Sequence, residues 1–309
     1  MSELFGIDVS HYQGNIDWGK VKATGKVEFA IMKAMYETSK RADETFEKNY
    51  ISCGTNGISR GVYNFIGSVS ASDPVADANA FLKILNGRKL EMGIWLDVES
   101  KNLRNLGKEK IESVILKETE IFESAGYKVG IYCNYDWYKN VITDKIKKVF
   151  DGRFWIARYP KADNGQYNTK STLSPKSYAV AWQYSSNGKV DGIVGNVDMD
   201  VLYKPIEEVF GKTEATPTNG CPYEHPTVCV TSRANAILKR FKGKYVTKGT
   251  EVGYVQWHLD RLGYDLGKGG IDLKCGGDTT KAIGKFQKDH GLKQDKIAGS
   301  KTYSVMDGQ

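Results

Sequence analysis

The chain has 309 residues, 40% hydrophobic and 26% charged, which is ordinary for a folded globular protein. No stretch is apolar for the eighteen or so residues that a membrane span requires, and residues 1–6 lack the basic and apolar regions of a secretory signal peptide. We therefore expect no membrane insertion and synthesis in the cytoplasm.

The net charge of +7 is concentrated near the C-terminus. Residues 1–210 carry 28 Lys and Arg against 27 Asp and Glu, whereas residues 211–309 carry 16 against 10. A basic tail favours a polyanionic partner such as nucleic acid, anionic lipid or a cell-wall polymer, and a solvated Lys-rich surface is the alternative. Five cysteines without a Cys-x-x-Cys pair argue against a disulfide scaffold and a zinc ribbon.

Apolar strands alternate with amphipathic helices through the first half of the chain. A capped helix is predicted from Asp73-Pro74 to Asn86-Gly87, a long one around residues 111–122, and a single helix over residues 137–150. This alternation implies a parallel sheet, and so many repeats favour a closed barrel. The predicted strands are residues 4–10, 27–33, 61–66, 93–99, 128–133 and 153–158.

The alternation fails after residue 158. Residues 159–175 show no apolar periodicity, and strands at residues 178–184 and 196–202 are joined by a turn at Asn187-Gly188 without a helix. We therefore expect an α/β fold, an irregular TIM-like (β/α) barrel whose last strands lack covering helices.

The strand at residues 93–99 ends with two acids, Asp97 and Glu99. Side chains two residues apart on a strand point the same way, with Cα atoms roughly 6 to 7 Å apart. A buried acid pair is costly unless it is paired or hydrogen-bonded, so such a pair is often functional. The alternative is that the two acids cap a strand and face solvent.

Barrels of this kind carry their chemistry at the C-terminal ends of their strands. Acids there can cleave glycosidic bonds, and aromatic faces can stack on sugar rings. The composition of the predicted strand ends therefore indicates a carbohydrate site, although a single aromatic such as Trp137 or Trp155 could equally belong to the core. The residues collected in this way are Asp8, Tyr63, Asp97, Glu99, Tyr132, Trp182 and Asp198.

Several separated motifs in residues 3–205 resemble the family-25 glycoside hydrolases, lysozymes that cut the β-1,4 bond after N-acetylmuramic acid in peptidoglycan. The motifs are FGIDVSHYQG at residues 5–14, WLDVE at 95–99, GIY at 130–132, and WQYSS at 182–186 followed by Val197-Asp198. One departure from the family pattern lies at residues 33–37.

The resemblance implies a role for each acid and no metal or cofactor. Glu99 would be the general acid, Asp97 and Asp198 would stabilise positive charge or position the acetamido group, and Asp8 would maintain the electrostatics of the site. Like charges crowded together raise the pKa of one member, which agrees with these roles. Retention and inversion both stay open, and we favour retention assisted by the substrate's acetamide. The expected substrate-binding residues are Tyr63, Tyr132 and Trp182.

The tail begins with a polar, breaker-rich linker at residues 211–220, and a helix is expected at residues 234–241. Helices are predicted over residues 252–262, 279–290 and 300–306, and residues 246–308 resemble a small three-helix peptidoglycan-binding domain. The expected organisation is a catalytic barrel at 1–210, a connecting segment at 211–245 and a wall-binding domain at 246–309.

A basic wall-binding domain would hold the enzyme at an insoluble anionic substrate. The expected partners are therefore peptidoglycan and anionic wall polymers rather than nucleic acid, and a homo-oligomer formed through this domain is the alternative. A phage endolysin that reaches the wall after the membrane is breached is the favoured cellular role, with a host autolysin as runner-up.

Two other enzyme classes and a non-catalytic binder compete with the lysozyme interpretation. A zinc amidase needs clustered ligands, whereas the histidines are scattered and no His-Glu-x-x-His motif occurs. A Cys/His peptidase needs a positioned pair, which the sequence does not indicate. A decayed barrel would be expected to lose at least one carboxylate. The four histidines are His11, His225, His258 and His290.

Overall fold

The computed structural model describes residues 3–210, 221, 223, 225–232 and 245–307. The chain forms two compact units. The predicted linker at 211–220 and the predicted helix at 234–241 lie outside the described residues, so the predicted domain boundaries stay predictions. None of the described helices combines the length and apolarity that a bilayer crossing needs.

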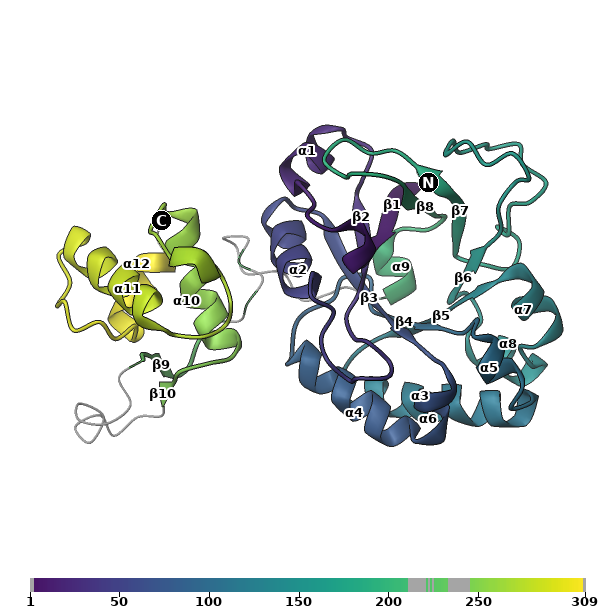
Figure 1. Cartoon of the computed structure of the whole chain (residues 1–309), viewed down its shortest axis with the longest axis horizontal. Coiled ribbons are helices and arrows are strands. Elements are labelled where there is room, and N and C mark those ends of the chain that lie inside the picture. The colour runs from purple at the N-terminus through teal and green to yellow at the C-terminus, as the bar shows by residue number, and fades with distance from the viewer. Residues whose placement is uncertain (1–2, 211–220, 222, 224, 233–244, 308–309) are drawn as a thin grey trace. The chain divides into compact units, whose positions relative to one another are not determined.

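Eight strands close into a barrel in the first unit (Figure 1), which confirms the predicted irregular α/β barrel. β1 to β7 pair in parallel in sequence order, whereas β8 runs antiparallel to both of its neighbours, β1 and β7. The strands are β1 (Leu4–Val9), β2 (Phe29–Lys33), β3 (Ser59–Phe65), β4 (Ile94–Asp97), β5 (Val129–Asn134), β6 (Phe154–Ala157), β7 (Ala181–Gly188) and β8 (Val197–Leu202).

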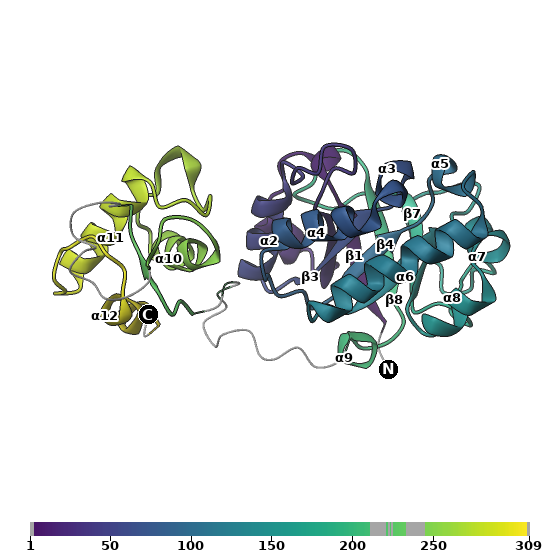
Figure 2. The same ribbon diagram turned by 90° about the horizontal axis from the view of Figure 1, so that it is seen from below.

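Helices cover the outside of the barrel, and α4 and α6 lie side by side along it (Figures 1 and 2), where the rings of Phe81 and Phe122 pack 5.4 Å apart.

The single helix predicted over residues 137–150 is wrong. The Thr143 hydroxyl accepts a hydrogen bond from the Ile146 N–H and so starts a second helix. The helices and 3₁₀ turn are η1 (His11–Gln13), α1 (Trp18–Ala23), α2 (Phe46–Thr55), α3 (Ser68–Ser72), α4 (Pro74–Leu85), α5 (Lys101–Arg104), α6 (Lys108–Ser124), α7 (Tyr135–Asn140), α8 (Asp144–Val149) and α9 (Ile206–Phe210).

The last strands lack covering helices, as predicted, because residues 158–180 form neither helix nor strand. The turn predicted at Asn187-Gly188 is wrong. β7 continues through Gly188, with register irregularities between Gln183 and Gly188, and the connection to β8 is residues 189–196. Irregular pairing of this kind bends a strand and increases its twist.

Large apolar side chains fill the barrel interior below its mouth. Trp95 and Trp155 pack edge to face with ring centroids 5.6 Å apart, and Phe29 lies in the same buried cluster. Two strand glycines make room for these rings, because a Cβ on Gly6 would lie 2.3 Å from Phe29 and one on Gly130 would lie 2.5 Å from Trp95. The interior is therefore a packed core, and polar chemistry is confined to the mouth.

The second unit contains the three helices predicted for the tail. The structure has α10 (Thr250–Arg261), α11 (Gly277–Asp289) and α12 (Ser300–Asp307), each beginning within two residues of its predicted start. The 3₁₀ turn η3 (Gly267–Gly269) follows α10, and a short parallel pair forms from β9 (Cys229–Val230) and β10 (Tyr245–Val246).

Two buried glutamines hold two equivalent loops in this unit. Gln256 Nε2 donates to Asp272 Oδ1, the Lys274 carbonyl and Thr279 Oγ1 at 2.8, 3.1 and 2.9 Å, and its Oε1 accepts from the Leu273 N–H at 2.9 Å. The amide thus satisfies backbone groups of the turn that its antiparallel bridge to Lys248 leaves unpaired.

Gln287 makes the same four bonds one helix later. Its Nε2 donates to Asp295 Oδ1, the Ile297 carbonyl and Thr302 Oγ1, and its Oε1 accepts from the Lys296 N–H. The residue after each Asp has a left-handed backbone, with φ of 60° in the first loop and 62° in the second. The unit is therefore an internal structural repeat, whose sequence signal is D-x-x-[AC]-G-x-x-T at residues 272–279 and 295–302.

We predict that Gln256→Ala opens the first loop, because it removes the acceptor of the partly buried Leu273 N–H, at a cost of about 1 to 3 kcal/mol. Hydrogen exchange of the full chain should show loss of protection at Leu273. Lys281→Ala, at an exposed position on α11, is the control and should leave that protection unchanged. If Leu273 were as well protected in Gln256→Ala as in the wild type, the role assigned to Gln256 would be contradicted.

Candidate active site

A pocket of about 280 Å³ lies at the mouth of the barrel and contains all four predicted acids. Every strand except β2 supplies a residue to it, directly or just beyond its end. The structure therefore brings together side chains that are spread over about two hundred residues of sequence. The lining residues are Asp8, Tyr63, Asp97, Glu99, Tyr132, Trp155, Tyr159, Gln183 and Asp198.

Asp198 reaches this mouth because β8 is antiparallel. It is the second residue of β8, and it pairs with Asp8 near the C-terminal end of β1. The start of an antiparallel strand lies beside the ends of its parallel neighbours. Selecting Asp198 as though it ended a parallel strand gave the right residue with the wrong strand direction.

The structure brings Tyr63 and Tyr132 into the pocket but not Trp182. Trp182 is 2% exposed, and its indole N–H donates to the Arg158 carbonyl at 2.9 Å. Because side chains alternate along a strand and Gln183 faces the pocket, Trp182 points to the other side of the sheet. The expected strand, residues 178–184, ended too early and so placed Trp182 near its end, whereas β7 runs from Ala181 to Gly188 and Trp182 lies near its start.

Three lining residues were not predicted as site residues: Trp155, Tyr159 and Gln183. Gln183 Nε2 donates to Asp8 Oδ2 at 2.5 Å, while its Oε1 accepts from the hydroxyls of Tyr132, at 2.8 Å, and Tyr159. Gln183 lies in the WQYSS motif, so strand alternation from the correct start would have selected it. Tyr159 follows β6 in the segment without periodicity, which gave no signal.

Burial and mutual repulsion set the electrostatics of the pocket. Burial, the Glu99 charge and the Asp8 charge raise the pKa of Asp97 well above its ordinary value, and Lys33 partly opposes this. Burial raises the pKa of Glu99, and a hydrogen bond from Asn134 lowers it. Burial, then the Glu99 charge, raises the pKa of Asp198 to about 6. Protonated carboxyl groups are thus available near neutral pH, as general acid catalysis requires.

Residues 33–37, where the sequence departs from the family pattern, contact neighbouring segments and do not line the pocket. The Glu37 carboxylate accepts the N–H groups of Val69 and Ser70 at 2.9 and 3.0 Å and so anchors the start of α3. Lys33 Nζ lies 5.5 Å from the ring centroid of Tyr36. Among the described residues, no three histidine, cysteine or acidic side chains are grouped as a metal site.

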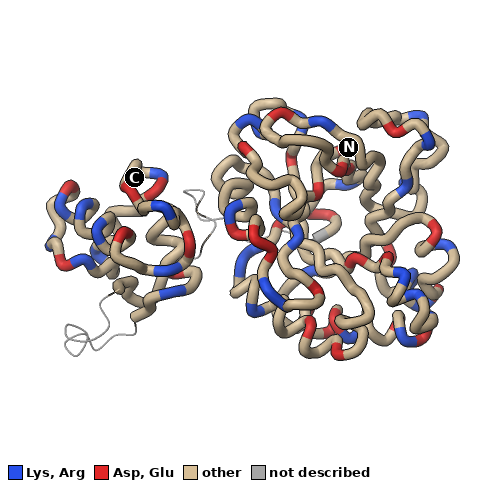
Figure 3. The backbone as a smooth tube through the Cα atoms, viewed as in Figure 1, with Lys and Arg blue, Asp and Glu red and all other residues tan. Residues whose placement is uncertain are grey.

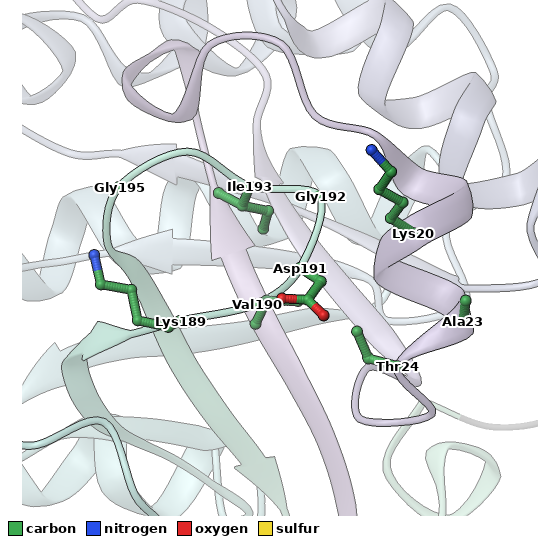
Figure 4. Close-up of a pocket in the computed structure, with 9 residues that line it drawn as sticks. All are labelled: Lys20, Ala23, Thr24, Lys189, Val190, Asp191, Gly192, Ile193 and Gly195. Carbon is green, nitrogen blue, oxygen red and sulfur yellow. The ribbon is translucent and has the colours of Figure 1, made fainter.

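A larger hollow of about 620 Å³ lies between α1 and the loop that joins β7 to β8 (Figure 4). Its charged side chains are Lys20, Lys189 and Asp191, all exposed. It lacks the paired carboxyl groups of the barrel mouth, so acid chemistry is assigned to the smaller pocket.

The raised pKa of Asp198 predicts how stability depends on pH. The stability that this group contributes is fully present below pH 3.8, its ordinary value, and is lost as pH rises through about 6. Asp198→Asn should therefore gain stability relative to the wild type between pH 4 and pH 7 in urea unfolding.

Asp163→Asn is the matched control with the opposite sign. The Asp163 carboxylate accepts hydrogen bonds from Ser185 and Ser186, which lower its pKa against the cost of burial. Its contribution is present above pH 3.8 and is lost as pH falls, so this variant should be weakened more at pH 7 than at pH 3. If the stability change depended on pH with the same sign in both variants, the electrostatic assignment would be refuted.

Comparison with known proteins agrees with this geometry. Curated relatives include the autolytic lysozyme of Clostridium acetobutylicum, 29% identical over 201 residues that cover 65% of this chain and 56% of the relative. Lysozyme M1 of Streptomyces globisporus is 31% identical over 218 residues, covering 64% and 67%. The bacterial lysozyme of Streptomyces coelicolor superposes with a TM-score of 0.56 at 25% identity, covering 68% of this chain and 98% of that one.

Two family models cover the two units. The model described as "Putative peptidoglycan binding domain" matches residues 248–306, where the repeat of buried glutamines lies. The other matches residues 7–193, more than half of the chain and nearly all of the barrel. The chain belongs to family 25 of the glycosyl hydrolases.

Proposed function

We propose that this glycoside hydrolase is an N-acetylmuramidase, which cuts the β-1,4 bond between N-acetylmuramic acid and N-acetylglucosamine in peptidoglycan. The convergence of four carboxyl groups and three tyrosines in one pocket carries the proposal. Acids of shifted pKa can protonate a leaving oxygen and stabilise an oxocarbenium ion, and phenol rings can contact sugar faces. The lysozyme names of the relatives support the same substrate.

Glu99 is the general acid in this proposal. It is the partly exposed member of the acid pair, so it can reach a glycosidic oxygen bound in the pocket. Burial keeps its proton available at higher pH than for a solvated glutamate. The Asn134 side chain hydrogen-bonds the same carboxyl group and fixes its orientation.

Asp97 is assigned to the substrate's acetamido group. It is 7% exposed, and its Oδ1 accepts no hydrogen bond from the described part of the chain. An acetamido N–H supplies the missing donor, and the acetamide oxygen can then attack the anomeric carbon with net retention. Asp8 and Asp198 supply the negative charge that stabilises the developing cation.

The second unit would hold the enzyme on the wall, since it matches a peptidoglycan-binding family. An endolysin role is our proposal for the cell biology, supported by this two-module organisation. Peptidoglycan and its anionic polymers are the proposed partners.

Glu99→Gln should lower kcat by at least about 10²-fold, because it removes the transferable proton but keeps the side-chain shape. Mass spectrometry of products from purified peptidoglycan should show new reducing N-acetylmuramic acid ends. New amino termini in place of reducing ends would contradict the proposal.

Glu118→Gln is the matched control. This carboxyl group is buried on α6, bonds the amide of Asn64 at 2.9 Å and lies outside the pocket, so activity should change less than about twofold. NMR of the first product should show the β anomer, and an α anomer would contradict the acetamide-assisted step.

A further inference from the structure

A fifth carboxyl group, Asp200, lies just beneath the pocket. It follows Asp198 by two residues on β8, so both side chains point into the barrel. Asp200 is 0% exposed, and the indole N–H of Trp155 donates to its Oδ1 at 2.9 Å. Trp155 lines the pocket above. Asp200 is therefore separated from the substrate space by one side chain.

The side chains of Asp200 and Asp8 lie next to each other and interact directly. The register of β1 and β8 explains this contact, because Gly6, without a side chain, pairs with Asp200 and Asp8 pairs with Asp198. Two carboxyl groups can bond directly only if one of them carries a proton, since an ionised carboxylate accepts but cannot donate.

The proton belongs on Asp200. Asp8 Oδ2 already accepts from Gln183 Nε2, whereas Asp200 Oδ2 faces no donor among the described residues. Burial, then the Asp8 and Asp198 charges, raises the pKa of Asp200 well above its ordinary value. Burial and the Asp198 and Glu99 charges raise the pKa of Asp8 as well, but the Gln183 amide and Asp200 act to lower it.

We propose that Asp200 is a positioning residue that stays protonated and donates its O–H to Asp8, so that Asp8 is held ionised and in place at the pocket. The proposal rests on glycoside hydrolysis at this pocket. A neutral donor orients Asp8 and leaves its negative charge intact. A lysine at this position would neutralise that charge. Asp8 can then face the developing positive charge of the sugar.

Two substitutions separate positioning from simple packing. In Asp200→Asn the amide can accept from Trp155 and donate to Asp8, so activity should stay within about threefold and the acidic limb of the pH–rate profile should not move. Asp200→Leu removes the donor and disfavours ionised Asp8. Its kcat should fall at least tenfold, and its acidic limb should move to higher pH by about one unit.

Infrared difference spectra provide a readout that does not depend on turnover. The wild type at pH 7 should show the carbonyl stretch of a protonated carboxyl group that Asp200→Asn lacks. The proposal would be overturned if that band were absent or if the two variants lost equal activity. It would also be overturned if the acidic limb of the pH–rate profile did not move in a folded Asp200→Leu protein. Failure of the wild type to release reducing ends would instead overturn the muramidase assignment.

The repeat in the second unit carries an independent inference, because its two loops are covered differently. Gln256 and Asp272 are 16 residues apart, whereas Gln287 and Asp295 are 8 apart. The longer connection contains η3, and a Cβ on Gly267 would lie 2.5 Å from the Asp278 carboxylate. The first loop is thus covered by its own connection.

The second loop is open, and a pocket of about 440 Å³ lies against it. By the repeat, Lys301 occupies the position of Asp278, and Lys293 lines the same pocket. The Asp295 carboxylate is turned inward and bonds Gln287 and the Ile297 N–H. Figure 3 shows basic residues over much of this unit, so charge alone selects no site, whereas the pocket does.

We infer that this pocket binds a carboxylate of the peptidoglycan stem peptide, an inference that rests on the proposed wall substrate. Lys281 and Lys285 on α11 are paired with Asp278 and Asp289, whereas Lys293 and Lys301 pair with no acid in the described ranges. The two pocket lysines are therefore available for a bound anion.

Sedimentation of the full-length Glu99→Gln protein with purified peptidoglycan, freed of secondary wall polymers, tests this inference. Adding Lys293→Glu and Lys301→Glu should weaken binding at least tenfold, whereas adding Lys281→Glu and Lys285→Glu should change it less than twofold. Equal loss in both pairs, or unchanged binding to glycan strands stripped of their stem peptides, would overturn it. With Glu99 intact, the first pair should still hydrolyse soluble glycan, which separates this failure from failure of the muramidase assignment.

Discussion

The site depends on crowding carboxyl groups into a largely buried space with few cations. Each buried charge loses hydration, and each neighbouring charge of the same sign adds repulsion. The cluster of carboxyl groups therefore cannot be fully ionised near neutral pH. Lys33 is the cation that lowers the pKa of Asp97. Protons are therefore retained at the barrel mouth, and a retained proton is what cleavage of a glycosidic bond consumes first.

The barrel makes this crowding tolerable. Below the acids, Trp95, Trp155 and Phe29 form a packed interior whose burial stabilises the fold. Above them, amides and phenols satisfy carboxylate oxygens without adding charge, as Gln183 does for Asp8. The antiparallel β8 then adds two more acids, Asp198 at the mouth and Asp200 just beneath it.

Alternation along single strands was enough to predict part of this site. Asp97 and Glu99 were identified as a pair from their spacing, and both line the pocket. Selection of strand-end residues misplaced Trp182, because the strand was predicted over residues 178–184 whereas β7 runs from Ala181 to Gly188, and the Trp182 side chain points away from the pocket. Such predictions are therefore most sensitive to where a strand begins and ends.

Contacts between distant segments could not be predicted from the sequence. Asp8 and Gln183 are 175 residues apart and meet only because the barrel closes, so no local pattern signals their hydrogen bond. The direction of β8 likewise depends on the short connection at 189–196 and not on the composition of the strand. In the second unit the helices were predicted from periodicity, whereas the glutamine repeat was missed because its loops differ in length.

Glutamine serves the same physical purpose in both units. A primary amide donates and accepts at once, so a single side chain can bridge a carboxylate and a hydroxyl, as Gln183 does, or close a turn, as Gln256 and Gln287 do. A charged residue in these positions would either neutralise the acid or need its own counterion in a buried place. Neutral bridges therefore let the barrel keep its negative potential where the sugar binds, and let the small unit bury its loops without ion pairs at their centres.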